Sequence, residues 1–261
     1  MNIRFFVCTG ALLGMSAVSG LTAPMTLSPF ALGGNSESNG WLTINASVFP
    51  STGSFPGTTM WSPLGSTTGG DAVLQKISNG AAGGPYAASG SMYFGGFSSN
   101  INYNGGTLAA VDTTPVANLS NIVFQLQIGE AWTYDFYNGV LPTLSYTTSS
   151  GTVSNIGATN WSLLEQYDNG TVSMPTGEET VYINTYALQW DLSAVTEDIT
   201  GFSISFTGVQ HGQLYAMQLD QSDAYVQAVP EPTTGLLFGA GAFVLVMRRR
   251  RSNLAEAPRA S

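Results

Sequence analysis

Few residues in this 261-residue chain could perform catalysis, since it contains one histidine and one cysteine. The histidine, His211, stands between Gln210 and Gly212, and no Gly-x-Ser-x-Gly motif marks a serine that it could activate. Cys8 lies in an N-terminal apolar stretch that we expect to be removed. The mature protein would then lack a thiol nucleophile, a disulfide and cysteine-ligated zinc. We therefore interpret His211 as a turn or packing residue.

Pairs of carboxylates are the other catalytic option, because a glycoside hydrolase needs only two Asp or Glu side chains at a suitable separation. Nothing in the spacing of the acidic residues selects one pair. The candidates are Glu130, Asp135, Glu165, Asp168, Glu178 and Glu179. Acidic residues in so acidic a chain are mostly solvated loop residues. A secreted glycoside hydrolase that uses an Asp/Glu pair is therefore the alternative function.

Calcium is the one cofactor that the sequence suggests, since hard oxygen ligands suit a cysteine-free extracellular protein. The candidate ligands are Asp220 and Asp223, and the segment Asp168-Asn169-Gly170 is a second candidate. Neither segment has the spacing of an EF-hand loop. Turn capping by Asp and Asn side chains is the more frequent role of such segments, so calcium binding stays an open expectation.

Aromatic residues offer the remaining lead, because exposed Trp and Tyr side chains stack on the faces of sugars. All five tryptophans and all 11 tyrosines follow residue 23. Trp41 and Trp190 lie in alternating segments and are expected in the core. Trp61 and Trp161 lie beside polar, loop-like sequence, so we predict that these two are exposed and could bind a carbohydrate.

The charge of the chain excludes one class of partner. Residues 24–229 contain one basic residue, Lys76, and 14 acidic residues, which gives a net charge of −13. Such a surface repels phosphate backbones, so we expect no nucleic-acid binding. Only 9% of the whole chain is charged and 43% is hydrophobic, so the chain can bury a core.

The elements that must position these side chains are short strands. Apolar and polar residues alternate, as in half-buried strands, over 41–49, 121–128, 180–191, 202–206 and 213–219, the last continuing toward 225–226. Asn-Gly pairs at Asn79, Asn138 and Asn169 predict hairpin turns. No segment of 24–229 keeps a helical period for more than two turns, so helix content should be low.

This pattern predicts a single all-β domain over 24–228, folded as a jelly-roll-like β-sandwich of about ten to twelve strands. The segment from Leu188 to the last strand is loosely similar to carbohydrate-binding jelly rolls. That similarity concerns the pattern alone and transfers no binding residue.

The N-terminus has the features of a secretory signal peptide. Arg4 is followed by an apolar stretch over 5–18 and by small residues that end at Ala23. The apolar stretch is shorter than the ~20 residues that span a bilayer. We therefore predict that 1–23 is a signal peptide and that signal peptidase is one partner.

The C-terminus has three parts in a fixed order. Val229-Pro230-Glu231-Pro232 comes first, and its prolines hold the chain extended. An apolar run over 233–247 follows as a marginal membrane span. The basic cluster Arg248, Arg249, Arg250 and Arg251 would remain in the cytoplasm by the positive-inside rule.

This tail, 229–261, resembles the PEP-CTERM sorting signal of exported Gram-negative bacterial proteins. The resemblance implies that an exosortase-like membrane peptidase processes the protein near Pro230-Glu231-Pro232. It also implies an inner-membrane intermediate, followed by release to the cell surface or extracellular matrix, often in bacteria that make exopolysaccharide. The resemblance covers roughly the last thirty residues and the signal peptide, and it assigns nothing to the domain between them.

The sequence therefore predicts an exported, non-catalytic cell-surface or matrix protein. Its expected partners are the two peptidases and an extracellular polysaccharide, which a carbohydrate-binding domain would contact.

Overall fold

The protein is a sandwich of two antiparallel β-sheets. The computed structural model describes residues 23–54, 56–81, 83–96, 100–174 and 177–230. Thirteen strands lie among these residues, with two short 3-10 turns, η1 (Pro50–Thr52) and η2 (Tyr137–Gly139). The predicted all-β sandwich is confirmed, and helix content is low as expected. Among the described residues, no helix is long and apolar enough to cross a bilayer.

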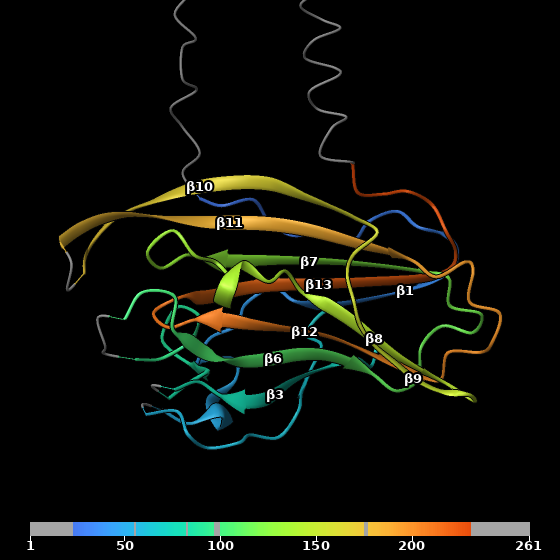
Figure 1. Ribbon diagram of the computed structural model, residues 1–261, viewed down its shortest axis with the longest axis horizontal. Coiled ribbons are helices and arrows are strands. Elements are labelled where there is room, and N and C mark those ends of the chain that lie inside the picture. The colour runs from blue at the N-terminus through green and yellow to red at the C-terminus, as the bar shows by residue number, and fades with distance from the viewer. Residues whose placement is uncertain (1–22, 55, 82, 97–99, 175–176, 231–261) are drawn as a thin grey trace, which may run out of the picture.

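Sheet A and sheet B pack face to face around one core. In Figure 1 the labelled strands of sheet A lie in the upper part of the molecule and those of sheet B in the lower part. Sheet A has the order β10 (Asn160–Met174), β11 (Gly177–Asp191), β7 (Asn121–Gly129), β13 (Gln213–Ala224), β5 (Met92–Tyr93) and β4 (Tyr86–Ala87), and β1 (Gly33–Trp41) also pairs with β13. Sheet B has the order β2 (Leu64–Gly65), β3 (Val73–Asn79), β6 (Asn104–Asp112), β12 (Gly201–Val209), β8 (Thr143–Thr148) and β9 (Gly151–Ile156).

The core between the sheets follows from the two-residue alternation of the strands. The core-facing residues of β7 and β12 are Ile122, Phe124, Leu126, Ile128, Phe202, Ile204 and Phe206. The rings of Phe124 and Phe206 meet across the interface with centroids 6.2 Å apart. Trp41 and Trp190 are buried in the same cluster, as predicted. Each large apolar side chain buried in this way contributes about 1.5–3 kcal/mol.

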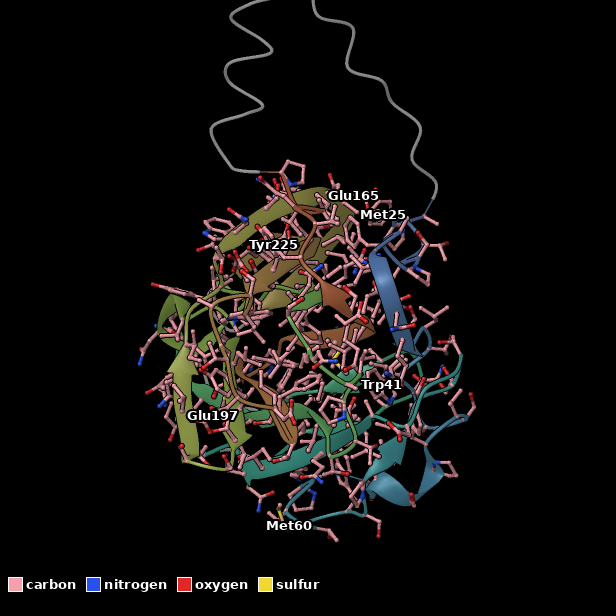
Figure 2. All side chains as sticks on the ribbon, turned by 90° about the vertical axis from the view of Figure 1, so that its right-hand side faces the viewer. Met25, Trp41, Met60, Glu165, Glu197 and Tyr225 are labelled. Carbon is pink, nitrogen blue, oxygen red and sulfur yellow. The ribbon has the colours of Figure 1, made fainter. Side chains whose placement is uncertain are left out.

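The outer face of β7, an inner strand of sheet A, is also buried, which the sequence did not indicate. Alternation predicted that β7 is half-buried, but all nine of its residues are buried. The reason is that two described segments, 23–32 and 225–230, pack against its polar face. Gln125 Nε2 donates a hydrogen bond to the Ser28 carbonyl at 2.8 Å, and Gln127 Nε2 donates one to the Met25 carbonyl. Figure 2 shows Met25 beside Glu165, and its N–H donates to Glu165 Oε2 at 2.7 Å.

Residues 23–32 and 225–230 together form what we call the terminal cover of sheet A. Its C-terminal part is held by Gln189, whose Oε1 accepts the N–H groups of Ala228 and Val229 at 3.0 and 3.1 Å. Gln189 Nε2 donates to the Val226 carbonyl at 2.6 Å. Val229 is fully buried against Val123 of β7. The cover therefore satisfies polar groups that the sheet would otherwise expose to water.

The first strand differs from its prediction. We expected a strand over 41–49, but β1 ends at Trp41 and pairs with β13. Asn45 explains the difference, because its Oδ1 accepts the N–H groups of Ser47 and Val48 at 3.0 and 3.2 Å. The Ile44 N–H still donates to the Tyr215 carbonyl of β13 at 3.2 Å, and the Asx turn at Asn45 then replaces strand pairing.

The three predicted Asn-Gly hairpin turns are also wrong, although one of the pairs has positive φ at both residues, as expected. Asn138 and Gly139 have φ of 57° and 67°, but they lie in η2 between strands of different sheets. Gly170 has φ of 85° at a bulge inside β10. Asn79 ends β3, which pairs with β6 and β2 rather than with the next strand. The bends are local, whereas strand pairing was decided by the core.

Candidate ligand-binding site

The site that we single out begins at a strained turn after β7. Ala131 and Tyr134 exchange two backbone hydrogen bonds of 2.9 and 3.0 Å across the turn. The two residues between them, Trp132 and Thr133, have φ of 50° and 67°. Two-residue turns of this kind favour Asn-Gly, because other side chains are strained at positive φ. Burial of the Trp132 ring, whose centroid lies 5.1 Å from that of His211, holds the turn in place.

This turn positions Asp135 beside two polar residues of β11. Tyr186 donates its hydroxyl to Asp135 Oδ2 at 2.6 Å. Asn184 Nδ2 donates to both Asp135 oxygens, at 2.9 and 3.1 Å, and to Glu130 Oε2 at 3.4 Å. One amide thus joins two carboxylates from opposite ends of the turn.

Trp161 completes the site from β10, the edge strand of sheet A. It pairs with Leu188 of β11, and cross-strand partners share a face, so Trp161 lies on the core-facing side of the sheet. Its ring centroid is 6.5 Å from that of Tyr186. Because β10 is at the edge, 39% of the Trp161 surface stays exposed. The prediction that Trp161 is exposed is confirmed.

These side chains enclose a pocket of about 290 Å³. Its lining residues are Thr133, Tyr134, Asp135, Phe136, Gly139, Leu141, Trp161 and Tyr186. The pocket combines aromatic rings with one carboxylate and two phenol groups. Its volume is just below the roughly 300–1,000 Å³ of pockets for drug-sized ligands, so it suits one small ring of a larger ligand.

Burial changes the acid–base behaviour of the site. It raises the pKa of Asp135, against which the hydrogen bonds from Tyr186 and Asn184 act. It also raises the pKa of Glu130, and the charge of Asp135 adds to that rise. Burial raises the pKa of the Tyr186 hydroxyl as well. The protonated forms of these groups are therefore favoured relative to water.

We expect the domain to become more stable as pH falls from 7 toward 5. Burial raises the pKa values of Glu130, Asp135, Asp112 and Asp220 in the folded state. Unfolded carboxyl groups titrate near ~4. Above that pH the folded state binds more protons than the unfolded state, so stability falls as pH rises. Thermal unfolding by circular dichroism at several pH values measures this. A lower unfolding midpoint at pH 5 than at pH 7 contradicts it.

The structure overturns the expectation for Trp61. This side chain is only 7% exposed, and its indole N–H donates to the Pro85 carbonyl at 3.4 Å. The prediction that Trp61 is exposed was wrong, because the segment around Pro85 covers a ring whose own neighbours in sequence are polar. A buried ring offers no face for a sugar to stack on.

The other acidic candidates lie apart from the pocket. Glu165 receives the N–H of Met25 in the terminal cover, and exposed Asp168 accepts the Gly170 N–H at 2.8 Å. Glu178 is exposed and Glu179 half-buried, near the start of β11.

His211 lies in the turn between β12 and β13, as predicted, and Tyr93 OH is 2.8 Å from its Nδ1.

The two aspartates predicted to bind calcium serve the N-terminal segment instead of converging. Asp220 is buried, and its Oδ2 accepts the Phe30 N–H at 2.9 Å. Asp223 accepts the N–H and side-chain amide of Asn35 at 2.8 and 2.6 Å. Three residues apart on β13, they point to opposite faces of the sheet. Calcium binding there stays a prediction.

One group of acidic residues among those described could hold a metal ion. Glu37, Asp71 and Asp112 each offer an oxygen, and these oxygens lie within 4.8 Å of one another. The buried member, Asp112, already accepts hydrogen bonds from the Thr114 N–H and from Gln221 Nε2. The sequence analysis did not select these three, since they are 34 and 41 residues apart along the chain.

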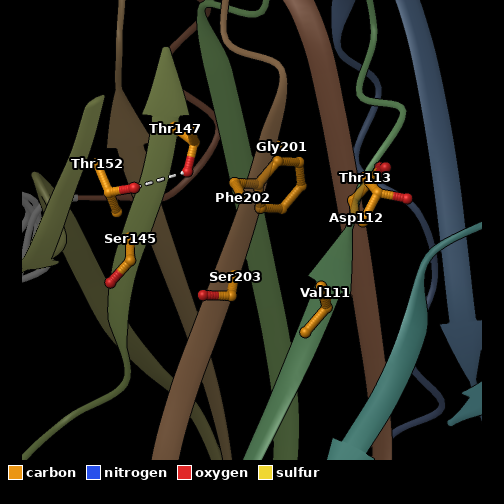
Figure 3. Close-up of a pocket in the computed structure, with 9 residues that line it drawn as sticks. All are labelled: Val111, Asp112, Thr113, Ser145, Thr147, Thr152, Gly201, Phe202 and Ser203. Atoms are coloured by element: carbon orange, nitrogen blue, oxygen red, sulfur yellow. Dashed lines mark hydrogen bonds between the residues drawn. The ribbon is translucent and has the colours of Figure 1, made fainter. Parts of the chain in front are cut away.

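A second pocket, of about 230 Å³, lies on sheet B (Figure 3). Hydroxyl side chains of Ser145, Thr147, Thr152 and Ser203 line it, and Thr147 and Thr152 are hydrogen-bonded at 3.0 Å. Its one ionisable lining residue is Asp112, whose two oxygens already accept hydrogen bonds from Thr114 and Gln221. It offers less chemistry than the pocket beside Trp161.

Sequence reasoning missed Asn184 and Tyr186, although a signal was present. In β11 they share the face of Leu188 and Trp190, which is the core-facing side. An asparagine in a core-facing position is unusual, so it marks a structural or functional site.

The described residues form a β-sandwich with an aromatic and acidic pocket beside Trp161. The model of the PEP-CTERM protein-sorting motif matches residues 228–251. The chain therefore carries this sorting motif, as its resemblance predicted. No curated protein and no solved structure matches the chain significantly.

The sorting motif implies that the protein is exported and processed by exosortase, a membrane protease. It further implies a membrane-anchored intermediate before the protein reaches the surface. Of the predicted motif residues, the structure describes Val229, which is buried, and Pro230, which is exposed. Glu231, Pro232, the span 233–247 and the cluster Arg248 to Arg251 lie outside the described residues, as does the predicted signal peptide except Ala23.

Proposed function

We propose that the exported domain is a non-catalytic carbohydrate-binding module, which binds a sugar in the pocket beside Trp161. The observation that carries this proposal is the pairing of a 39% exposed indole with a carboxylate in one pocket. The indole provides a flat apolar surface for a sugar ring. Asp135 and Tyr186 provide polar groups that can bond its hydroxyls.

The sorting motif supports a location at the cell surface, where the domain could meet a carbohydrate. A protein delivered to the surface meets extracellular polysaccharide, so binding it would retain the processed protein in a matrix. We propose that the host is a Gram-negative bacterium and that signal peptidase removes residues 1–23 before the tail is processed. The net charge of −13 over 24–229 supports the exclusion of nucleic acid as a partner.

A secreted glycoside hydrolase is the second candidate, and the joining of Glu130 to Asp135 through Asn184 favours it. The pockets argue for binding instead. Asp135 lines the pocket beside Trp161, whereas Glu130 lines a separate pocket of about 190 Å³ with Tyr182 and His211. The two acids of a glycosidase must flank one scissile bond in a shared cleft.

Replacing Trp161 with alanine should weaken carbohydrate binding about tenfold or more, because the stacking surface is lost. The purified full chain is tested on a glycan array and then by calorimetry with the oligosaccharide that binds. Leu163→Ala is the matched control, since Leu163 lies two residues along the same face, is 43% exposed and does not line the pocket.

Three outcomes separate the candidates. Binding without release of reducing sugar supports the module, and hydrolysis that Glu130→Gln abolishes supports the glycosidase. If no glycan binds, or if both alanine variants bind as well as the natural chain, the carbohydrate site beside Trp161 is wrong.

A further inference from the structure

The pocket beside Trp161 is lined by one carboxyl group and by no basic side chain of the described residues. Asp135 lines it, and Asn184 joins Asp135 to Glu130. The pKa values of both carboxyl groups are raised by burial. Within this partly buried setting, a positive charge supplied by a ligand would lower the free energy of both ionised groups.

Hydrogen-bond donors are in short supply in the same cluster. The amide nitrogen of Asn184 already donates to the carboxylates of Glu130 and Asp135, and the Tyr186 hydroxyl donates to Asp135. Asn184 Oδ1 is left without any hydrogen-bond partner, in a side chain that is only 3% exposed. Buried polar atoms rarely lack a hydrogen-bond partner, and those that do are usually explained by strain, by a functional role or by a bound species. Asn184 does not itself line the pocket, so a ligand that brings hydrogen-bond donors would meet this group of acceptors at Asp135.

No basic side chain can take that role in the described part of the chain. None lines the pocket. The single basic residue among the described positions is Lys76 on β3 of sheet B, which is 4% exposed. Its ammonium donates to the carbonyls of Gly57 and Thr59. A positive charge that pairs with these carboxyl groups would therefore have to come from outside the described residues.

We infer that the pocket beside Trp161 selects a sugar that carries a protonated amine. Asp135 receives the ammonium group, and the rings of Trp161 and Tyr186 form the surface on which the sugar lies. An alkyl ammonium has three N–H donors, no acceptor and a full positive charge, and it gains further from the faces of aromatic rings. A sugar carboxylate would instead meet Asp135 unpaired, so uronic acids are rejected. This inference rests on the proposed carbohydrate binding.

Calorimetry with the purified full chain tests the inference using three oligosaccharides of equal length. These are oligomers of glucosamine, of N-acetylglucosamine and of galacturonic acid. At pH 6, where the amine is protonated, the glucosamine oligomer should bind at least about tenfold more tightly than the acetylated one. A tenfold ratio corresponds to about 1.4 kcal/mol, close to the lower end of the roughly 1.5–3 kcal/mol of a hydrogen bond to a charged group. The galacturonic acid oligomer should not bind.

Variants separate local recognition from overall charge. Asp135→Asn should reduce the ratio of the two affinities to near one, and Glu130→Gln should reduce it less, because Glu130 acts through Asn184. Glu130→Gln also keeps the test available if Asp135→Asn does not fold. Asp198→Asn is the charge-matched control at an exposed position outside the pocket, and it should leave the ratio unchanged.

The outcomes distinguish this inference from the proposed function. Equal binding of the amine and its acetylated form overturns the selection of an amine but leaves carbohydrate binding intact. If the galacturonic acid oligomer binds more tightly than the glucosamine oligomer, the selection of an amine is also overturned. If none of the three binds and the glycan array is likewise blank, the proposed function itself fails.

Discussion

A variant in which alanine replaces Pro230, Glu231 and Pro232 should be exported normally, but nearly all of its molecules should retain the uncleaved C-terminal tail. The matched sorting motif spans 228–251, and these three residues lie near its start. The two prolines hold the backbone extended and remove two N–H groups. The segment is therefore held in an extended conformation that a peptidase can bind. Alanine removes both constraints together with the charge of Glu231.

The fold should not be affected by this change, which makes the result interpretable. The bonds of the terminal cover end at the Val229 N–H, and Pro230 is exposed. Mass spectrometry of the protein from membrane and surface fractions of the native host measures the retained tail. Gln227→Ala, an exposed residue just before the matched segment, is the control. Processing of the triple variant at the natural rate would disprove the role of this motif.

The sorting motif was predictable from the sequence because its information is linear. Two prolines, an apolar run and four arginines stand in order, and no tertiary contact is needed to read them. The sandwich was predictable for a similar reason, since alternation along strands such as β12 is local. The terminal cover was not, because Gln125 and Gln127 find partners about a hundred residues away in Ser28 and Met25.

The candidate site was predictable only in part. Trp161 and Asp135 were among the candidates, but nothing linked them, since 26 positions separate them along the chain. Their meeting depends on the turn at Trp132 and Thr133, which adopts positive φ without the usual Asn-Gly sequence. Trp61 shows the opposite error, because a polar neighbourhood in sequence did not prevent burial under a distant segment.

Gln189→Leu should lower the free energy of unfolding by about 2–4 kcal/mol and release residues 226–230 from sheet A. Gln189 is fully buried, and leucine has a similar volume, so packing is largely kept. The substitution removes a donor to Asn121 Oδ1 at 2.8 Å and the acceptor of two backbone N–H groups in the cover. Each buried polar group left unsatisfied costs about 1–3 kcal/mol. The loss is limited because the released segment can bond to water.

Urea unfolding of the full chain measures the stability change, and hydrogen exchange of the Ala228 and Val229 amides reports the release directly. Gln227→Leu is the matched control, as it lies in the same segment with its side chain exposed, and it should change stability by less than about 0.5 kcal/mol. Equal exchange rates in the two variants would mean that Gln189 does not hold the cover. Faster exchange only in Gln189→Leu means that one side chain of the folded sheet positions the first residues of the matched sorting motif, which starts at residue 228.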